Sequence, residues 1–180
     1  MAQVQHVTDK TMPQLTFVVG GARSGKSRYA ENLMAVLQPP WTFVATAEAG
    51  DAEMAERIAA HRLRRGKNWR TVEAPHDLSA VLAACEAPTM VDCLTLWLSN
   101  RMLAGADLEA EIARLEAALD SLRAPVILVS NEVGSGIVPN NELARRFRDT
   151  QGCLNQRMAA RADRVVLMVA GLPVVVKEAR

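Results

Sequence analysis

The chain has 180 residues, of which 49% are hydrophobic and 23% charged, a composition that excludes a disordered or fibrous protein. The formal charge is +1 and only 4% of residues are aromatic, which argues against a nucleic-acid-binding surface. No apolar run reaches the roughly 18 residues that indicate a membrane span, the polar N-terminus is unlike a signal peptide, and the cysteines fit no zinc or disulfide spacing. We therefore expect a cytoplasmic protein with a flexible lead-in at residues 1–14 and a single domain at 15–180.

Apolar runs and amphipathic segments alternate along the chain, beginning with a strand predicted at 15–19 that ends at Gly20 and Gly21. A helical pattern then extends from Ser24 to the Pro39-Pro40 pair, which interrupts it. The first of the remaining expected elements are a strand at 41–45, a helix that Asp51 caps and Gly66 ends, an extended segment at 68–73 and a helix at 77–85. They are followed by a strand at 89–92, helices at 94–103 and 108–122, a strand at 125–129, a helix at 141–162 and strands at 164–169 and 173–176.

The strands at 125–129 and 164–169 are apolar at nearly every position rather than at alternate positions. Such strands are buried on both faces, as in a parallel sheet that is covered by helices on both sides. Because the chain also lacks an internal repeat and a linker, the pattern predicts one α/β domain built on a mostly parallel β-sheet.

Eight residues between the first strand and the first helix match the motif G-x-x-x-x-G-K-[ST], namely Gly20, Gly21, Ala22, Arg23, Ser24, Gly25, Lys26 and Ser27. In this setting backbone N–H groups wrap the phosphates of a nucleotide, and the helix N-terminus adds the positive end of its dipole. Lys26 is expected to reach the β- and γ-phosphates, and Ser27 to ligate Mg²⁺. The alternative is a glycine turn followed by a chance Lys-Ser pair. Both flanks agree with the motif, so we predict a P-loop NTPase-like fold.

Asp92 ends the short apolar strand at 89–92 and is the candidate Walker B carboxylate. In that role it would hold Mg²⁺ from the second coordination sphere or through a water. The alternative is that Asp92 caps the helix that begins near Leu94.

His61 follows Met54 and Ile58 on one face of the helix predicted between Asp51 and Gly66. Cationic residues crowd the same part of the sequence, at positions 57, 62, 64, 65, 67 and 70. Such a cluster in a nearly neutral chain suggests a polyphosphate site, although a solvated basic helix face explains it equally well. Cationic neighbours favour the neutral imidazole, the nucleophilic form that a covalent phosphoramidate mechanism requires.

The segment 130–139 follows the most apolar strand and contains Asn131 and Glu132. In an open α/β sheet, ligands bind at the loops that follow the carboxyl ends of the strands. Asn131 and Glu132 are therefore candidates to face phosphates or a substrate hydroxyl. A glycine-rich connection without a ligand role is the alternative, and the spacing does not choose between the two.

Taken together, the segments 20–27, 45–47, 51–61, 69–73 and 131–139 resemble the bifunctional adenosylcobinamide kinase/adenosylcobinamide-phosphate guanylyltransferase family. The P-loop alone is shared by many NTPases, whereas its combination with Glu-Met-x-x-Arg-Ile-x-x-His and Asn-Glu-Val-Gly-x-Gly-Ile-Val-Pro is far more specific. The resemblance covers nearly the whole chain from Leu15 to Lys177.

Membership of this family implies two reactions. A nucleoside triphosphate, ATP or GTP, phosphorylates the aminopropanol hydroxyl of adenosylcobinamide, and GTP then transfers GMP to the product through a GMP-histidine. The matching histidine is His61, since Ala60 replaces the second histidine of some relatives, and Asp92 replaces a glutamate found in others. The resemblance also implies Mg²⁺, a homotrimer, and nucleotide contacts at the loop from Gly20 to Ser27 and at Ala45, Thr46, Ala47, Arg62, Leu63, Arg64, Arg65, Glu73 and Asp92.

Two other functions are open at this point. A different P-loop kinase of small molecules would need no covalent intermediate, so it would tolerate the loss of His61. A nucleotide-binding switch that acts through a partner protein would hydrolyse nucleotide slowly and turn over no corrinoid.

Overall fold

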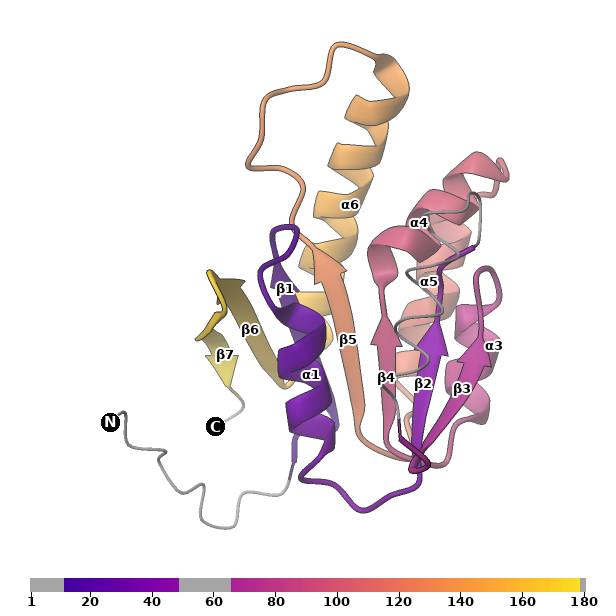
Figure 1. Cartoon of the computed structure of the whole chain (residues 1–180). Helices are drawn as coiled ribbons and strands as arrows, with labels where there is room; N and C mark the ends of the chain where they lie inside the picture. The colour runs from indigo at the N-terminus through magenta and orange to yellow at the C-terminus, as the bar shows by residue number, and fades with distance from the viewer. Residues whose placement is uncertain (1–11, 49–65, 179–180) are drawn as a thin grey trace.

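The computed structural model describes residues 12–48 and 66–178 of the chain. Within these residues seven strands form one sheet in the order β3-β2-β4-β5-β1-β6-β7 (Figure 1). The strands are β1 (Leu15–Gly20), β2 (Trp41–Ala45), β3 (Trp69–Glu73), β4 (Thr89–Asp92), β5 (Val126–Asn131), β6 (Arg164–Val169) and β7 (Leu172–Glu178). The helices are α1 (Lys26–Met34), α3 (Leu78–Ala84), α4 (Leu94–Leu103), α5 (Leu108–Leu119) and α6 (Glu142–Arg161).

Strands β1 to β6 are mutually parallel, and β7 alone pairs antiparallel, with β6. Parallel pairing brings the carboxyl ends of β1 to β6 to one edge of the sheet, called the carboxyl edge below. The connection from β6 to β7 is tight, because Ala170 and Gly171 both adopt left-handed conformations, with φ of 50° and 83°. The predicted mostly parallel α/β sheet is confirmed.

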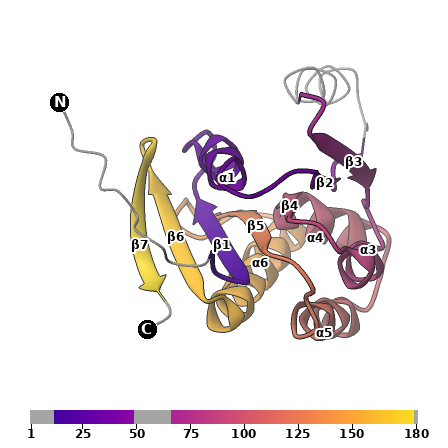
Figure 2. The ribbon, with the colours of Figure 1, turned by 90° about the horizontal axis from the view of Figure 1, so that it is seen from below.

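Helices cover both faces of the sheet, as the sequence predicts, but unequally (Figure 2). Helix α1 lies on one face, and α3, α4, α5 and α6 lie on the other. The chain moves across the sheet in one direction from β1 to β2 and in the opposite direction from β3 to β4 to β5 to β6. Because parallel crossovers are right-handed, reversing the direction of travel moves the helices to the other face.

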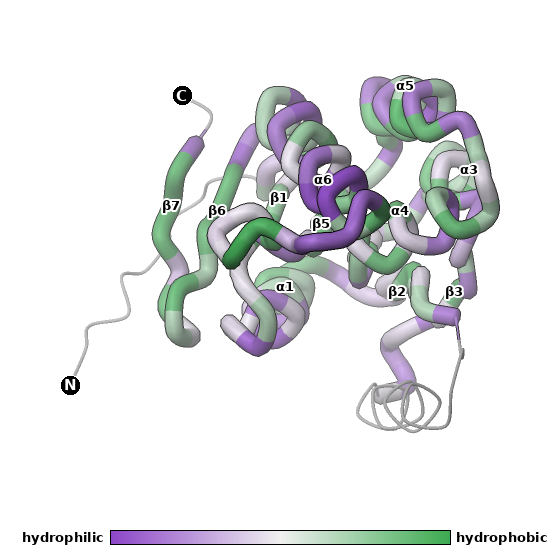
Figure 3. The backbone as a smooth tube through the Cα atoms, turned by 90° about the horizontal axis from the view of Figure 1, so that it is seen from above, coloured by the Kyte–Doolittle hydropathy of each residue, from purple (hydrophilic) through white to green (hydrophobic). Residues whose placement is uncertain are grey.

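Alternating side chains of the central strands fill two hydrophobic cores. Phe17 and Leu128 belong to the core under α3 to α6, which also buries Trp97. Val18 and Ile127, their neighbours in sequence, belong to the core under α1. Figure 3 shows the resulting pattern, with hydrophobic central strands and a largely hydrophilic outer surface on α6. No helix among residues 12–48 and 66–178 has the length and apolarity needed to cross a membrane.

Several predicted boundaries differ from the observed ones. The first helix ends at Met34 rather than at the proline pair, because Val36 and Leu37 donate to carbonyls three residues back and tighten the chain into a turn. Helix α5 ends at Leu119, three residues before the predicted end. Strand β5 continues to Asn131, which pairs with Gly20 and was expected in the following loop. The helix predicted to begin at Asp51 and end at Gly66 lies, up to residue 65, outside the described residues.

Ion pairs join α5 to α6 on the outer side of the larger helical layer. Arg157 donates from Nε to Glu116 Oε1 at 2.9 Å and contacts Oε2 of the same carboxylate through a second nitrogen. Arg161 lies 3.2 Å from Glu116 Oε1. The hydrogen bond from Arg157, more than that from Arg161, lowers the pKa of Glu116 to about 2. The ion pairs of Glu116 therefore stabilise the packing of α5 against α6, away from the carboxyl edge.

Candidate active site at the carboxyl edge

Two glycines allow the turn between β1 and α1. A Cβ on Gly20 would lie 2.6 Å from the carbonyl oxygen of Met168 on the neighbouring strand β6, so the loop can leave the sheet there only without a side chain. Gly25 adopts φ of 94° immediately before Lys26, the first residue of α1. That left-handed conformation favours glycine and turns the chain directly into the helix.

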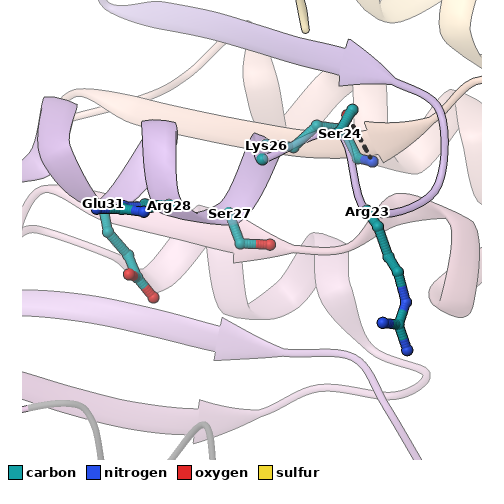
Figure 4. A pocket seen from close by; sticks show the side chains of 7 residues that line it. Arg23, Ser24, Lys26, Ser27, Arg28 and Glu31 are labelled. Atoms are coloured by element: carbon teal, nitrogen blue, oxygen red, sulfur yellow. Dashed lines mark hydrogen bonds between the residues drawn. The ribbon is translucent and has the colours of Figure 1, made fainter. Parts of the chain in front are cut away.

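The loop and the first turn of α1 line a hollow of about 510 Å³ (Figure 4). Ser27 and Glu31 point to the same side of the helix, and the Arg23 side chain extends away from the loop. The earliest helical hydrogen bond runs from Tyr29 N to Gly25 O, at 3.0 Å. The N–H groups before it have no partner within the helix, an arrangement that binds anions.

The Lys26 side chain lies along the loop and is only 7% exposed. Its ammonium donates to Gly21 O at 2.6 Å and reaches Ser24 Oγ at 3.5 Å, so it is held in the curve of the loop. Burial lowers the pKa of Lys26, while the charges of Cys93 and Asp92 act in the opposite direction. Both acceptors are neutral, so the ammonium gains from exchanging them for anionic phosphate oxygens, which form stronger hydrogen bonds.

Asp92 is the last residue of β4 and pairs in register with Ala45 on one side and Val129 on the other. One strand, β5, separates β4 from the P-loop strand β1, which corresponds to about 10 Å across the sheet. Cys93, and not Asp92, occupies the N-cap position of α4. The helix-cap alternative for Asp92 is therefore wrong, because the cap position falls one residue later.

Ser27 and Asp92 suit a magnesium ion that is shared with a nucleotide. Among residues 12–48 and 66–178, no group of three or more His, Cys, Asp or Glu side chains could hold a metal. Mg²⁺ needs no such cage, because it keeps several waters and takes its other ligands from one or two carboxylates and from substrate phosphates. A hydroxyl in the first turn of α1 and a carboxylate on β4 supply what this kind of site needs.

The expected contacts on β2 and β3 lie together but away from the loop. Ala45 and Glu73 end their strands as a paired couple. Strand β2 is three positions from β1 and β3 is four, or about 14 and 19 Å by strand spacing. Beyond the end of β2, Ala47 is half-buried, whereas Thr46, which lies between Ala45 and Ala47, is fully buried. The structure therefore divides the expected contacts into a P-loop group and a β2–β3 group, with Asp92 between them.

The segment after β5 is joined to the P-loop through the backbone. Glu132 N donates to Gly20 O at 3.0 Å. The Glu132 carboxylate accepts from Gly134 N at 2.6 Å and from Ser135 N at 3.2 Å. Hydrogen bonding from Ser135 lowers the pKa of Glu132, against an opposing effect of burial. Glu132 thus organises its own loop, which lies beside the nucleotide-binding loop.

Buried polar residues that sequence reasoning missed hold the end of β5. Thr95 Oγ1 accepts from Asn131 N at 2.8 Å, and Asn155 Nδ2 donates to Asn131 O at 3.0 Å. Ser130 Oγ donates to Asn155 Oδ1 at 2.7 Å. The polar types of Thr95 and Asn155 are the only sign of this network in the sequence, and Asn155 does not stand out in the largely polar helix α6.

His61, Arg62, Leu63, Arg64 and Arg65 lie outside the described residues. Their roles as nucleophile and nucleotide contacts stay predictions.

The sheet, the loop and the strand-end carboxylate define a protein with the P-loop NTPase fold. The chain is similar to the ATPase EscN of the enteropathogenic E. coli type III secretion system, with a TM-score of 0.59 and 9% identity over 88% of this chain and 43% of that chain. It is also similar to the RadB recombinase, with a TM-score of 0.50 and 19% identity over 86% of this chain and 74% of that chain. Similarity at these identities shows the fold alone.

A family model described as "Cobinamide kinase / cobinamide phosphate guanyltransferase" matches residues 16–176. The chain is 48% identical to the bifunctional adenosylcobalamin biosynthesis protein CobP of Pseudomonas aeruginosa, over 89% of this chain and 95% of that protein. It is 41% identical to the corresponding CobU protein of Salmonella typhimurium, over 91% and 99%. The chain therefore belongs to the cobinamide kinase / cobinamide phosphate guanyltransferase family, and the resemblance and the enzyme class predicted from the sequence are confirmed.

Proposed function

We propose that this enzyme phosphorylates adenosylcobinamide with ATP or GTP, and then transfers GMP from GTP to the resulting phosphate through a GMP-histidine at His61. The observation that carries the proposal is the P-loop, in which the Lys26 ammonium donates to Gly21 O beside an open hollow suited to anions. The family model supports it, because its match extends over residues 16–176.

In the kinase step the oxygen of the substrate hydroxyl attacks the γ-phosphorus and its proton passes to solvent, while the bond to the β-phosphate oxygen breaks and the nucleoside diphosphate leaves. The loop N–H groups and the Lys26 ammonium hold the β- and γ-phosphates and stabilise the charge that moves onto the leaving group. Bound Mg²⁺, held by Ser27 and Asp92, would neutralise part of the phosphate charge. The protein contributes mainly positioning and electrostatics, which is how phosphoryl transfer is usually catalysed.

In the guanylyl step an imidazole nitrogen of His61 attacks the α-phosphorus of GTP, and pyrophosphate leaves. A phosphate oxygen of cobinamide phosphate then attacks the same phosphorus, the P–N bond breaks and the histidine is restored. The covalent route divides one difficult displacement into two easier ones.

Two labelled nucleotides test the proposal with the wild-type protein. With γ-labelled ATP or GTP and adenosylcobinamide, label should move to the corrinoid. With α-labelled GTP alone, an acid-labile and base-stable label should stay on the chain in denaturing electrophoresis. Corrinoid labelling without labelled protein would favour a plain kinase, and neither product together with stable nucleotide binding would favour a nucleotide switch.

We expect Asp92→Asn to weaken Mg²⁺-dependent turnover far more than nucleotide binding in the absence of metal. The amide keeps the size of the side chain but loses the charge that attracts a hard cation. A Mg²⁺ titration of the kinase rate should shift by about 10-fold or more. If the titration of the variant overlays that of the wild type, Asp92 has no part in the metal site.

A further inference from the structure

The ends of β2, β3 and β4 are joined by side-chain hydrogen bonds in addition to the sheet ladder. Thr46, the residue after β2, is 0% exposed. Its Oγ1 donates to Cys93 O at 2.7 Å and accepts from Cys93 N at 2.8 Å. The last ladder pair between these strands is Ala45 with Asp92, so the Thr46 hydroxyl continues the connection one residue past the end of β4.

Asn100 on α4 makes the second connection. Its Nδ2 donates to Thr46 O at 2.8 Å and to Pro75 O at 3.2 Å, which ties the end of β2 to the segment after β3. Trp97, one turn earlier on the same helix, is fully buried and donates from Nε1 to His76 O at 3.0 Å. Helix α4 therefore holds the chain just beyond β3 at two successive carbonyls.

These contacts bear directly on Asp92, because Cys93 N belongs to the peptide group that follows it. The Thr46 hydroxyl fixes that peptide group on one side, and the β4 ladder fixes the backbone on the other. The Asp92 side chain leaves from the Cα atom between these two fixed groups, so its direction depends on both, and its charge already acts on Lys26. Outer contacts that orient a ligating carboxylate affect metal affinity although they touch neither metal nor substrate.

We propose that Thr46 and Asn100 are positioning residues for the metal and nucleotide site. The Thr46 hydroxyl holds Asp92 through Cys93, and the Asn100 amide holds Thr46 and the end of β3. The buried Thr46 side chain acts through the backbone, in place of the direct nucleotide contact that the family resemblance implies. This inference rests on the proposed role of Asp92 in binding Mg²⁺.

Thr46→Val and Thr46→Ser form the matched test, since valine keeps the shape without the hydroxyl and serine keeps the hydroxyl. Equilibrium binding of a fluorescent GTP analogue is measured against Mg²⁺ concentration without turnover, together with kcat and KM of the kinase step. For Thr46→Val the half-saturating Mg²⁺ should rise about 10-fold and kcat should fall, while metal-free binding changes little. Thr46→Ser should restore values within about 2-fold of wild type, because both hydrogen bonds of the hydroxyl are available again.

Glu116→Gln is the control for stability alone. It weakens the α5–α6 ion pairs and should lower Tm, but leave the Mg²⁺ dependence at the wild-type value. Asn100→Asp removes both amide donors and should raise the half-saturating Mg²⁺ in the same direction as Thr46→Val. It also serves as the deciding variant if Thr46→Val does not fold.

Folded Thr46→Val or Asn100→Asp with a lower Tm and a wild-type Mg²⁺ titration would overturn the positioning role. That result differs from a failure of the proposed function. In the latter case the wild type itself would bind nucleotide without Mg²⁺ dependence, and Asp92→Asn would behave like the wild type.

Discussion

Lys26→Ala should abolish both phosphoryl and guanylyl transfer while the chain remains folded. The Lys26 ammonium is the side-chain cation that the loop holds in place, 2.6 Å from Gly21 O and within the hollow that α1 opens. Both reactions displace a charged leaving group from the phosphate chain, a nucleoside diphosphate in one and pyrophosphate in the other. Removing a donor placed at such a developing charge costs about 10²–10³-fold in rate.

Folding should survive, because the lysine nitrogen contacts the loop that it serves and neither hydrophobic core contains the side chain. Circular dichroism and Tm would verify this. Lys177→Ala is the matched control, since its ammonium caps carbonyls of Ala159 and Ala160 and it pairs with Val165 at the opposite edge of the sheet. Wild-type rates from folded Lys26→Ala protein would exclude this loop as the nucleotide site.

The parts of the site that the sequence predicts correctly are those encoded by neighbouring residues. The P-loop is eight consecutive residues, and its effect on the backbone, a left-handed Gly25 followed at once by a helix, depends on that local sequence alone. The strands at 41–45 and 89–92 were also predicted with their observed bounds, because short apolar runs between polar turns are local signals. The position of Asp92 at a strand end follows from the same kind of signal.

What the sequence does not predict depends on residues that are far apart along the chain. Thr46 meets Cys93 across 47 positions, and Asn100 meets Thr46 across 54. No periodicity carries such pairings, which exist only after the strand order places β2 between β3 and β4. The same order separates the expected nucleotide contacts at Ala45 and Glu73 from the P-loop. The sequence therefore indicates candidate residues of the site, but not the distances between them in the fold.

That spacing bears on the proposed covalent step. A nucleotide whose γ-phosphate sits on the P-loop presents its α-phosphate farther from Lys26, in the direction of groups outside the loop. Transfer at the γ-phosphorus therefore needs only the loop, the metal residues and an oriented hydroxyl. In the proposed function, transfer at the α-phosphorus uses an additional group, His61, which the sequence places within a cluster of cationic residues.

His61→Ala should consequently separate the two reactions. We expect the variant to lose guanylyl transfer and to show no protein label from α-labelled GTP, while kinase turnover persists at a reduced or unchanged rate.

In the wild type, labelling should decline at acidic pH, because a protonated imidazole has no lone pair with which to attack phosphorus. His61→Asn, which keeps a polar group of similar size, should be as inactive in labelling as the alanine variant, since an amide nitrogen is not nucleophilic. His76→Ala is the matched control: its imidazole pairs with Glu48 at 2.8 Å, and its removal should leave the label in place. Undiminished GMP labelling in folded His61→Ala protein would assign the intermediate to another residue, and loss of the kinase step as well would mean that His61 acts on the nucleotide in both reactions.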